Sequence, residues 1–401
     1  MISFDEARER ILGKAPATRN EQVALHDALG RVLAEDVRAR RDAPPWDNTA
    51  VDGYAVRAAD TVGATPARPV TLRVLETVAA GAMASRPVGP GEAIRIMTGA
   101  PMPPGADAVV MVEDTQGAGE CVTILQAAGT ADNVRPRGED VRAGDVVLGP
   151  GLTLRPGHLG MAAQLGRSQM MVTRRPTVGI LSTGDELVEI DESPSDEKIL
   201  NVNSHALAAQ VLEAGAIPVR LGIAKDTPEA IRAGIRAGLD CDVLLISGGV
   251  SMGDFDFVKP VMDELGGGLE FWKVRIKPAR PLAFGMIGGV PTFGLPGNPV
   301  SSMVSFELFV RPFLRRAMGH RAIHRPTVQA RLTEPVRKKA GRRFFLRAVL
   351  ERDEHGPTCR TTGPQGSGML TSMMLADALM DLPDAWDGPL PVGHVVTLHI
   401  L

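Results

Sequence analysis

The sequence contains little cysteine, few aromatic residues and no long apolar run, and each shortage excludes a class of protein. Its three cysteines, Cys121, Cys241 and Cys359, form neither a CxxC pair nor a disulfide framework, so we expect a protein of the reducing cytoplasm. No apolar run reaches the length of a membrane span, and the polar N-terminus does not resemble a signal peptide. No membrane association is expected.

Charge of one sign is not in excess either. The chain has 44 Lys and Arg against 47 Asp and Glu, a net charge of −3. A general nucleic-acid binder needs a basic surplus, so we expect no nucleic-acid partner. Aromatic residues make up only 4%, so the core must be built mainly from aliphatic side chains and the 17 methionines. At 401 residues, two or three domains are expected.

The pattern of the chain changes three times. Short β-like runs broken by Gly and Pro, from about 41 to 151, predict an all-β insertion. Regular strand–helix alternation over 176–314 predicts a parallel sheet with helices on its faces. After the linker-like 324–326, short strands predict a small terminal β-barrel.

Three loops of the α/β region carry acids, hydroxyls or glycines where a strand is expected to end. The apolar run 243–246 stops at Ser247-Gly248-Gly249, and the other loops are 182–186 and 225–227. In an open α/β sheet, ligands bind beyond the carboxyl ends of the strands. Glycines let backbone N–H groups approach a phosphate, and nearby carboxylates indicate a divalent cation. The sequence therefore predicts a site for a phosphorylated ligand and a metal.

Carboxylates in these loops have a second explanation. An acid before a helix commonly caps it, and for Asp226, followed by Thr227-Pro228, capping explains the residue as well as a ligand site does. Capping explains Glu186 less well, because no helix start follows it. Asp254 and Asp256 come directly after the glycine loop, where the next helix is expected.

Cations follow in the next segment. Lys273, Arg275 and Lys277 alternate, so on a strand they share one face, and Arg280 stands between Ala279 and Pro281. A lysine-protected strand edge explains the alternation but not the proline-framed Arg280, which suits an oxyanion or phosphate.

Three further loops are dense in functional groups. Loop 295–302 opens a helix with Asn298 as cap and Pro299 as first residue, and it is either an anion site or a plain capped helix start. Loops 44–55 and 135–140, which contain Asp52 and Asp140, are either simple turns or parts of a site. There is no Ser–His–Asp pattern and no His/Cys metal spacing.

Taken in order, these segments resemble the molybdopterin molybdenumtransferase family, whose relatives include the gephyrin E domain. The resemblance covers nearly the whole chain and rests on DNTAVDGYA, IRIMTGAPMPPGADAVV, RPRGED, STGDE, SGGVSMGDFD, FWKVRIKP and LPGNPVS. It implies a molybdenum insertase, which ligates molybdate to the dithiolene of adenylylated molybdopterin, releases AMP and uses Mg²⁺. It also implies a cytoplasmic homodimer, with the molybdopterin adenylyltransferase and apo-molybdoenzymes as partner proteins.

The resemblance implies a multi-domain α/β plus β fold. Residues 1–43 and 141–175 form a dimer-forming α+β linker domain, and 44–140 form the β-rich insertion. Residues 176–322 form the central parallel α/β molybdopterin-binding domain, and 326–401 the small β-barrel. The site is expected between the α/β domain of one subunit and the insertion of the other.

Site roles are carried over position by position. Glu186, Asp226 and Asp256 are implied to bind the metal, with Asp52 and Asp140 arriving from the second subunit. Lys273 and Lys277 are implied to hold molybdate, and Arg347 and Ser367 to add anion contacts from the barrel. The residues implied to bind the pterin cofactor are Thr183, Gly184, Asp185, Ser247, Gly248, Gly249, Ser251, Arg280, Pro296, Asn298, Pro299 and Ser301.

Two departures from the family pattern stand out. Ala279 replaces a glycine, and Asn201 stands where relatives often have an aspartate, two residues before Asn203.

The alternative functions are those of an adenylyltransferase-like enzyme, which resembles 176–320 only, and of a gephyrin-like binding or scaffold paralogue. A pyrophosphatase of the competence-damage-inducible family also shares only the α/β module. Stand-alone adenylyltransferases lack the insertion and barrel, and scaffolding relatives carry a long disordered linker and a second catalytic domain, which this sequence does not contain.

Overall fold

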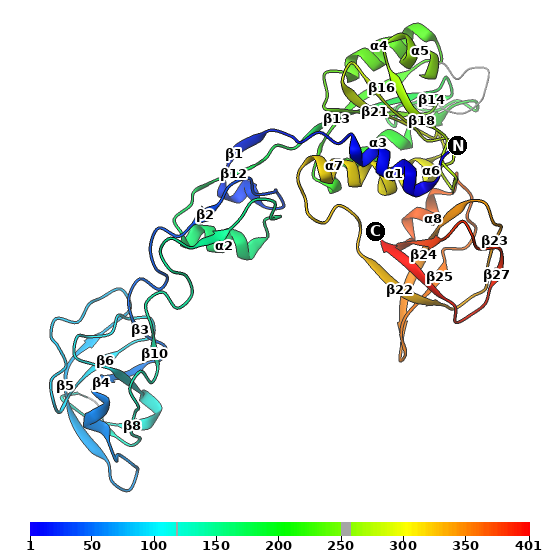
Figure 1. Ribbon diagram of the computed structural model, residues 1–401. Coiled ribbons are helices and arrows are strands. Elements are labelled where there is room, and N and C mark those ends of the chain that lie inside the picture. Colours follow the sequence, from blue (N-terminus) through cyan, green and yellow to red (C-terminus); the bar gives the residue numbers. More distant parts are fainter. Residues whose placement is uncertain (118, 250–257) are drawn as a thin grey trace.

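The computed structural model describes residues 1–117, 119–249 and 258–401. Figure 1 shows an elongated molecule with a β-rich unit at one end and a thin connecting unit in the middle. The other end carries an α/β unit beside a small β unit. None of the helices in the described ranges combines the length and apolar character needed to cross a membrane.

A six-stranded sheet forms the centre of the α/β unit, in the order β16-β13-β17-β21-β20-β18. The first four strands are parallel, which confirms the predicted parallel sheet, and β20 pairs antiparallel with both β21 and β18. The bounds are β13 Thr177–Thr183, β16 Ile217–Ala224, β17 Val243–Ser247, β18 Gly268–Trp272, β20 Ala283–Ile287 and β21 Val290–Leu295. The helices are α3 Val202–Ala214, α4 Pro228–Gly238 and α5 Val258–Glu264.

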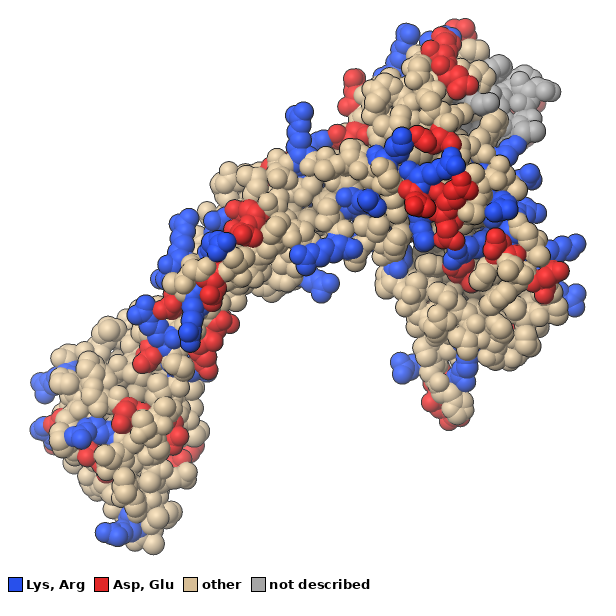
Figure 2. Space-filling model, in the orientation of Figure 1, with Lys and Arg blue, Asp and Glu red and all other residues tan. Residues whose placement is uncertain are grey.

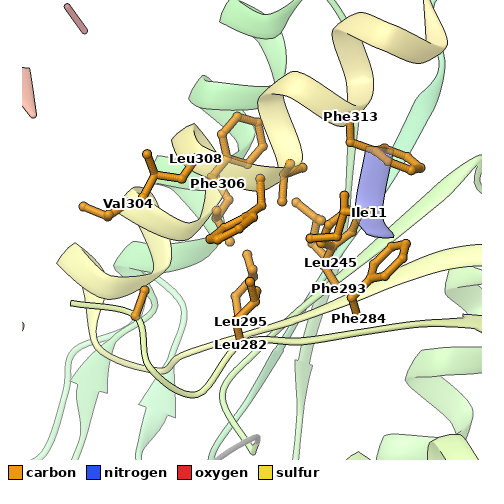
Figure 3. Close-up of a cluster of buried hydrophobic side chains, with 14 of the residues drawn as sticks. Ile11, Leu245, Leu282, Phe284, Phe293, Leu295, Val304, Phe306, Leu308 and Phe313 are labelled. Atoms are coloured by element: carbon orange, nitrogen blue, oxygen red, sulfur yellow. The ribbon is translucent and has the colours of Figure 1, made fainter. Parts of the chain in front are cut away.

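Strand β17 shows why its sequence is apolar throughout. Leu245 packs into the cluster on the α3 side of the sheet, whereas Leu244 and Ile246 pack into the cluster on the α4 side. A strand covered on both faces needs apolar residues at every position. Figure 3 shows Leu245 within the first cluster, with Phe284 and Phe293 of the neighbouring strands.

One long helical segment closes this core. It consists of α6 Pro299–Ser305, a π-helical turn Phe306–Val310 and α7 Arg311–Ala317. Helix α1, Phe4–Gly13, packs against it, with the Phe4 ring centroid 5.4 Å from that of Phe309. The Ser3 hydroxyl accepts a hydrogen bond from Glu6 N at 3.1 Å, so Ser3 caps α1.

The C-terminal β unit is a closed five-stranded barrel, in the order β24-β25-β22-β28-β26 and back to β24. Its strands are β22 Thr327–Leu332, β24 Arg343–Asp353, β25 Gly356–Thr361, β26 Ala378–Leu382 and β28 Val395–Ile400. The prediction of a small barrel is confirmed. Further short elements are β14 Leu187–Val188, β15 Ile199–Leu200, β19 Ile276–Lys277, β23 Val336–Lys338, β27 Gly388–Leu390 and α8 Leu370–Met374.

Strand pairing and an ion pair are among the contacts that join the barrel to the α/β unit. Strand β19 pairs in parallel with β24, placing Lys277 opposite Phe344. Arg343 of β24 forms an ion pair with Asp5 of α1, 3.1 Å between Nη1 and Oδ2. Figure 2 shows acidic and basic side chains intermixed where these two units meet.

The N-terminal third contains the predicted β insertion. Its sheet has the order β7-β4-β6-β5-β9-β8 and two separate apolar clusters of its own. The strands are β4 Gly53–Val56, β5 Val70–Val78, β6 Glu92–Ile96, β7 Ala108–Met111, β8 Thr115–Gln116 and β9 Cys121–Ile124, with β3 Asn48–Thr49 and β10 Val134–Arg135 at its base. The connecting unit contains β1 Asn20–Ala24, β2 Val37–Arg38, β11 Val146–Leu148, α2 Pro156–Gln164 and β12 Gln169–Thr173.

Candidate functional site

A cavity of about 480 Å³ lies at the carboxyl edge of the α/β sheet, where sequence reasoning places the ligand. Loops after β13, β16, β17 and β21 all reach it. Most of the implied cofactor-binding and metal-binding residues line it: Thr183, Gly184, Glu186, Asp226, Ser247, Gly248, Gly249, Pro296, Asn298 and Pro299. The prediction that these loops meet at one edge is therefore confirmed.

The acidic wall of this cavity is formed by Glu186 and Asp226. Asp226 is fixed by a reciprocal pair of hydrogen bonds with Asp185: Asp185 N donates to Asp226 Oδ2 at 3.4 Å, and Asp226 N donates to Asp185 Oδ1 at 3.2 Å. Asp185 itself does not line the cavity, so within the described structure it holds the loops rather than contacting the ligand space.

The helix-cap explanation of Asp226 is wrong. Helix α4 is capped by the next residue, Thr227, whose hydroxyl accepts a hydrogen bond from Ala230 N at 3.3 Å. The carboxylate of Asp226 therefore does not serve the helix and remains part of the cavity wall. Asn298 behaves similarly: it occupies the N-cap position of α6, but its side chain makes no capping hydrogen bond.

The glycine loop packs too tightly for any side chain. Gly248 has φ +101°, and a Cβ there would lie 2.5 Å from the carbonyl oxygen of Thr183. Its N–H donates to Leu295 O at 3.1 Å, which ties the loops after β17 and β21 together. Gly184 is also required, because a Cβ at its φ of +149° would lie 2.6 Å from a carboxylate oxygen of Glu186.

Asn203 is a site residue to which sequence reasoning assigned no role. Its amide nitrogen donates to the Ser247 hydroxyl at 2.9 Å and to Gly297 O at 2.7 Å, so it fixes two of the cavity loops. Its position two residues into α3, at the same edge of the sheet, was the only available signal. The other lining residues that were not predicted are Leu187, Ile199, Leu200, Asn201, Val202, Pro281 and Gly297.

A second cavity of about 380 Å³ adjoins the first and shares Pro281, Pro296 and Asn298 with it. Its walls are cationic, and its lining includes Lys277, Arg280, Ser301, Arg342, Arg347 and Ser367. The two cavities therefore adjoin, with carboxylates lining the first and cations lining the second.

Arg347 is the most unusual of these cations. Only 1% of its surface is exposed, and no carboxylate in the described part of the chain pairs with it. Its Nε donates to the Ser372 hydroxyl at 3.1 Å and its Nη2 to Gly366 O at 3.2 Å. Burial lowers the pKa of Arg347 to about 10, so it is still charged at neutral pH. A buried cation without an acid suits a cavity that receives an anion.

The prediction that Lys273, Arg275 and Lys277 share one strand face is wrong. Strand β18 ends at Trp272, and Lys273 has φ +73°, a left-handed conformation that turns the chain. Lys273 lines neither cavity, and its Nζ lies 5.1 Å from the ring centroid of Trp272. Ala279 has φ +72°, which explains why a glycine is favoured at this position in the resembling family.

The two remaining acids lie in the insertion unit or at its base. Asp52 accepts hydrogen bonds from the N–H and the hydroxyl of Thr98, both at 2.7 Å, and these bonds lower its pKa. Asp140 accepts from Gln164 Nε2 at 3.2 Å. Both residues are exposed. Figure 1 shows the insertion at the far end from the α/β unit, so one chain does not bring its acids to the cavity.

Of the residues named for the site from the sequence, Ser251, Asp254 and Asp256 lie outside the described residues. Within the described ranges, no group of three or more His, Cys, Asp or Glu side chains is arranged to hold a metal ion. Glu186 and Asp226 face the cavity with the carboxylate oxygens that Mg²⁺ prefers, but they would need further ligands.

The fold and site together define an α/β protein with an acidic and a cationic cavity at the carboxyl edge of a parallel sheet. Comparison with known proteins defines the family. Residues 2–166 match the model of the MoeA N-terminal region (domain I and II), 179–316 that of a probable molybdopterin binding domain, and 329–401 that of the MoeA C-terminal region (domain IV).

Full-length relatives agree. The chain is 42% identical to molybdopterin molybdenumtransferase 2 of Mycobacterium tuberculosis over 96% of each chain. It is 36% identical to molybdopterin molybdenumtransferase of Bacillus subtilis, over 96% of this chain and 91% of the relative. A crystal structure of molybdopterin biosynthesis moeA protein from Pyrococcus horikoshii OT3 superimposes with a TM-score of 0.86 at 33% identity, covering all of both chains. The chain belongs to the molybdopterin molybdenumtransferase family.

Proposed function

We propose that this protein is a molybdenum insertase, which ligates molybdate to the dithiolene of adenylylated molybdopterin and releases AMP. The observation that carries the proposal is the pair of adjoining cavities, one with an acidic wall and one with a cationic wall, which share Asn298. A reaction between a phosphorylated ligand and an oxyanion needs both walls next to each other. The names of the relatives support the same reaction.

The acidic end would receive the adenylylated ligand. Glu186 and Asp226, together with Asp256, would hold Mg²⁺, which when bound neutralises charge on the phosphates of the ligand. The backbone of Gly249 and the hydroxyl of Ser247 would offer hydrogen bonds to the pterin-phosphate end, whereas the Gly248 N–H is used by Leu295 O.

The cationic end would hold molybdate. Lys277, Arg280 and Arg347 supply positive charge around a space of about 380 Å³, and the hydroxyls of Ser301 and Ser367 supply donors for oxyanion oxygens. Lys273 lines neither cavity, so its proposed role would require the chain to rearrange or the ligand to reach beyond these walls.

The domain division is part of the proposal: a linker domain of 1–43 and 141–175, an insertion of 44–140, an α/β domain of 176–322 and a barrel of 326–401. Separate apolar clusters in the linker, the insertion and the barrel support it. Helix α1 is shared, because Phe4 and Ile11 pack into the α/β core.

The quaternary structure and location are proposed as well. A cytoplasmic homodimer would let Asp52 and Asp140 of a second subunit approach the cavity, which they do not reach within one chain. The molybdopterin adenylyltransferase would supply the substrate, and apo-molybdoenzymes would receive the product.

The proposal is tested by the reaction itself. Purified protein is mixed with adenylylated molybdopterin, Mg²⁺ and molybdate, and AMP is measured together with reconstitution of an apo-molybdoenzyme. We expect AMP release that depends on molybdate and yields active molybdoenzyme. AMP no higher than in the protein-free control would refute the proposed function.

A further inference from the structure

A third cavity, of about 670 Å³, opens on the barrel side of the cationic cavity. The two share Lys277 and Arg342, so the third cavity adjoins the cationic cavity on the barrel. We call this third cavity the barrel groove. Its wall contains five cations and a single acid: Lys277, Arg337, Lys338, Lys339, Arg342 and Asp387.

The five cations of the barrel groove outnumber its single carboxylate. Arg337, Lys339 and Arg342 are exposed, and none of them forms an ion pair with a carboxylate in the described ranges. The neighbouring Arg343 is fully paired, with Asp381 at 2.6 Å and Asp5 at 3.1 Å. Asp387, the single acid, accepts a hydrogen bond from Ala340 N at 3.2 Å. The groove therefore presents a net positive wall.

The floor of the groove is built from buried groups. Lys338 is only 3% exposed, and its Nζ donates to the carbonyl oxygens of Trp386 at 2.9 Å and of Asp384 at 3.3 Å. Phe344 lies between two ammonium groups, with Lys338 Nζ 5.2 Å and Lys277 Nζ 5.0 Å from its ring centroid. This arrangement holds Lys277 where the groove meets the cationic cavity.

We infer that the barrel groove is the entrance through which the tetrahedral dianion reaches the cationic cavity. The inference rests on the proposed function, in which the adenylylated ligand fills the first cavity from the sheet edge. The second reactant then needs another route, and the groove is the cationic surface adjoining its binding space. A wall of one charge sign accelerates capture of an oppositely charged ligand by roughly 10-fold to 1,000-fold.

The test neutralises the outer groove and leaves both inner cavities intact. The double variant Arg337→Gln/Lys339→Gln changes two exposed cations that line only the barrel groove. The matched control is Arg316→Gln/Arg352→Gln, which removes two exposed cations elsewhere and changes the net charge equally. AMP release is measured against molybdate concentration at two ionic strengths.

We expect kcat/KM for molybdate to fall about fivefold or more in the groove variant at low ionic strength, with kcat changed less than twofold. The difference should shrink at about 0.15 M salt, where the Debye length is roughly 8 Å. The control variant should match the wild type throughout.

Equal kcat/KM values for groove variant and control would overturn the inference. It would also be overturned if the variant lost only cofactor delivery to an apo-molybdoenzyme, because the groove would then dock an acidic protein. The association rate of molybdate, measured by stopped flow, distinguishes failure of the groove inference from failure of the proposed function. A salt-dependent association rate that the variant reduces, in a protein that releases no AMP, would support the groove and refute the insertase.

Discussion

The α/β unit and the β insertion both carry acids in loops that stand out in the sequence, yet the structure treats these acids differently. Glu186 and Asp226 line a cavity, and Asp226 is held there through the backbone of its neighbouring loop. The Asp52 carboxylate is instead occupied by Thr98 on an exposed surface. An acidic loop therefore becomes a ligand site only where neighbouring elements build walls around it.

The same comparison is the basis for proposing a site shared with a second subunit. The hydrogen bonds from Thr98 lower the pKa of Asp52, so its carboxylate is charged and oriented without a ligand of its own. A fixed carboxylate at the end of a long unit can complete a cavity in another molecule. It cannot complete the cavity of its own chain, from which the connecting unit separates it (Figure 1).

The largest expected effect is at the acidic wall. Glu186→Gln keeps the size of the side chain but removes its charge, so AMP release should fall about 100-fold or more if the carboxylate serves Mg²⁺. The matched control, Glu197→Gln, removes an exposed acid outside the cavity and should be neutral. An active Glu186→Gln enzyme would remove this residue from the metal site.

Mixing two kinds of variant subunit tests whether the insertion of one subunit completes the site of the other. Asp52→Asn and Glu186→Gln should each be inactive alone, but co-expressed and assembled at random they should recover about a quarter of wild-type activity. Half of the dimers are then mixed, and each mixed dimer has one site with both acids intact. No recovery, with mixed dimers demonstrated by differential tags, would contradict a shared site.

Arg347 tests the cationic end. Arg347→Met removes a buried charge that has no acid partner, so the KM for molybdate should rise about tenfold. Molybdate should also raise the melting temperature of the wild type but not of this variant, because only the wild type binds it. Arg347→Lys, which keeps the charge, should give an intermediate result. An unchanged KM in Arg347→Met would exclude a role in holding the anion.

A smaller effect, on stability, is expected where the α/β unit meets the connecting unit. His320, after α7, is buried, and its Nδ1 lies 2.8 Å from the Thr153 hydroxyl of the connecting unit. Burial lowers the pKa of His320 to about 4, with Arg315 adding to the effect. Between the unfolded pKa of 6.5 and about 4, the unfolded state binds the proton first, so stability falls as pH falls through this window.

From pH 7 to pH 5 the free energy of unfolding should fall by about 2 kcal/mol. Denaturant titrations at several pH values measure this decrease. His320→Gln should lose this pH dependence, whereas His26→Gln, at an exposed position, should keep it. If the free energy of unfolding changed equally with pH in both variants, His320 would not be the group that causes the pH dependence.

Much of the fold could be predicted from local patterns. The buried strand at 243–246, the short β runs of the insertion and the barrel strands were found because burial imposes apolar runs or alternation that is visible within a few residues. Local patterns failed where a single backbone angle determines the end of a strand. The left-handed conformation of Lys273 ends a strand that the alternation of charges would have continued.

The candidate site was predictable to the same extent. Parallel strands bring their carboxyl ends to one edge, so Glu186, Asp226 and Ser247 could be expected to meet. The choice between Asp226 and Thr227 as the cap of α4 could not be made, because both side chains can accept the same N–H bonds. Asn203 gave no signal beyond its position, because its role depends on Ser247 and Gly297, both distant in sequence.

By itself, the sequence determined the order of units, the parallel sheet and the loops that carry the chemistry. These follow from hydrophobic periodicity and from the torsional needs of glycine, which are properties of short segments. Packing in three dimensions buries Arg347 with no carboxylate partner among the described residues, places the acidic and cationic cavities side by side at Asn298, and keeps Asp52 far from both. Distances between segments depend on packing across the whole chain, and no short segment contains them.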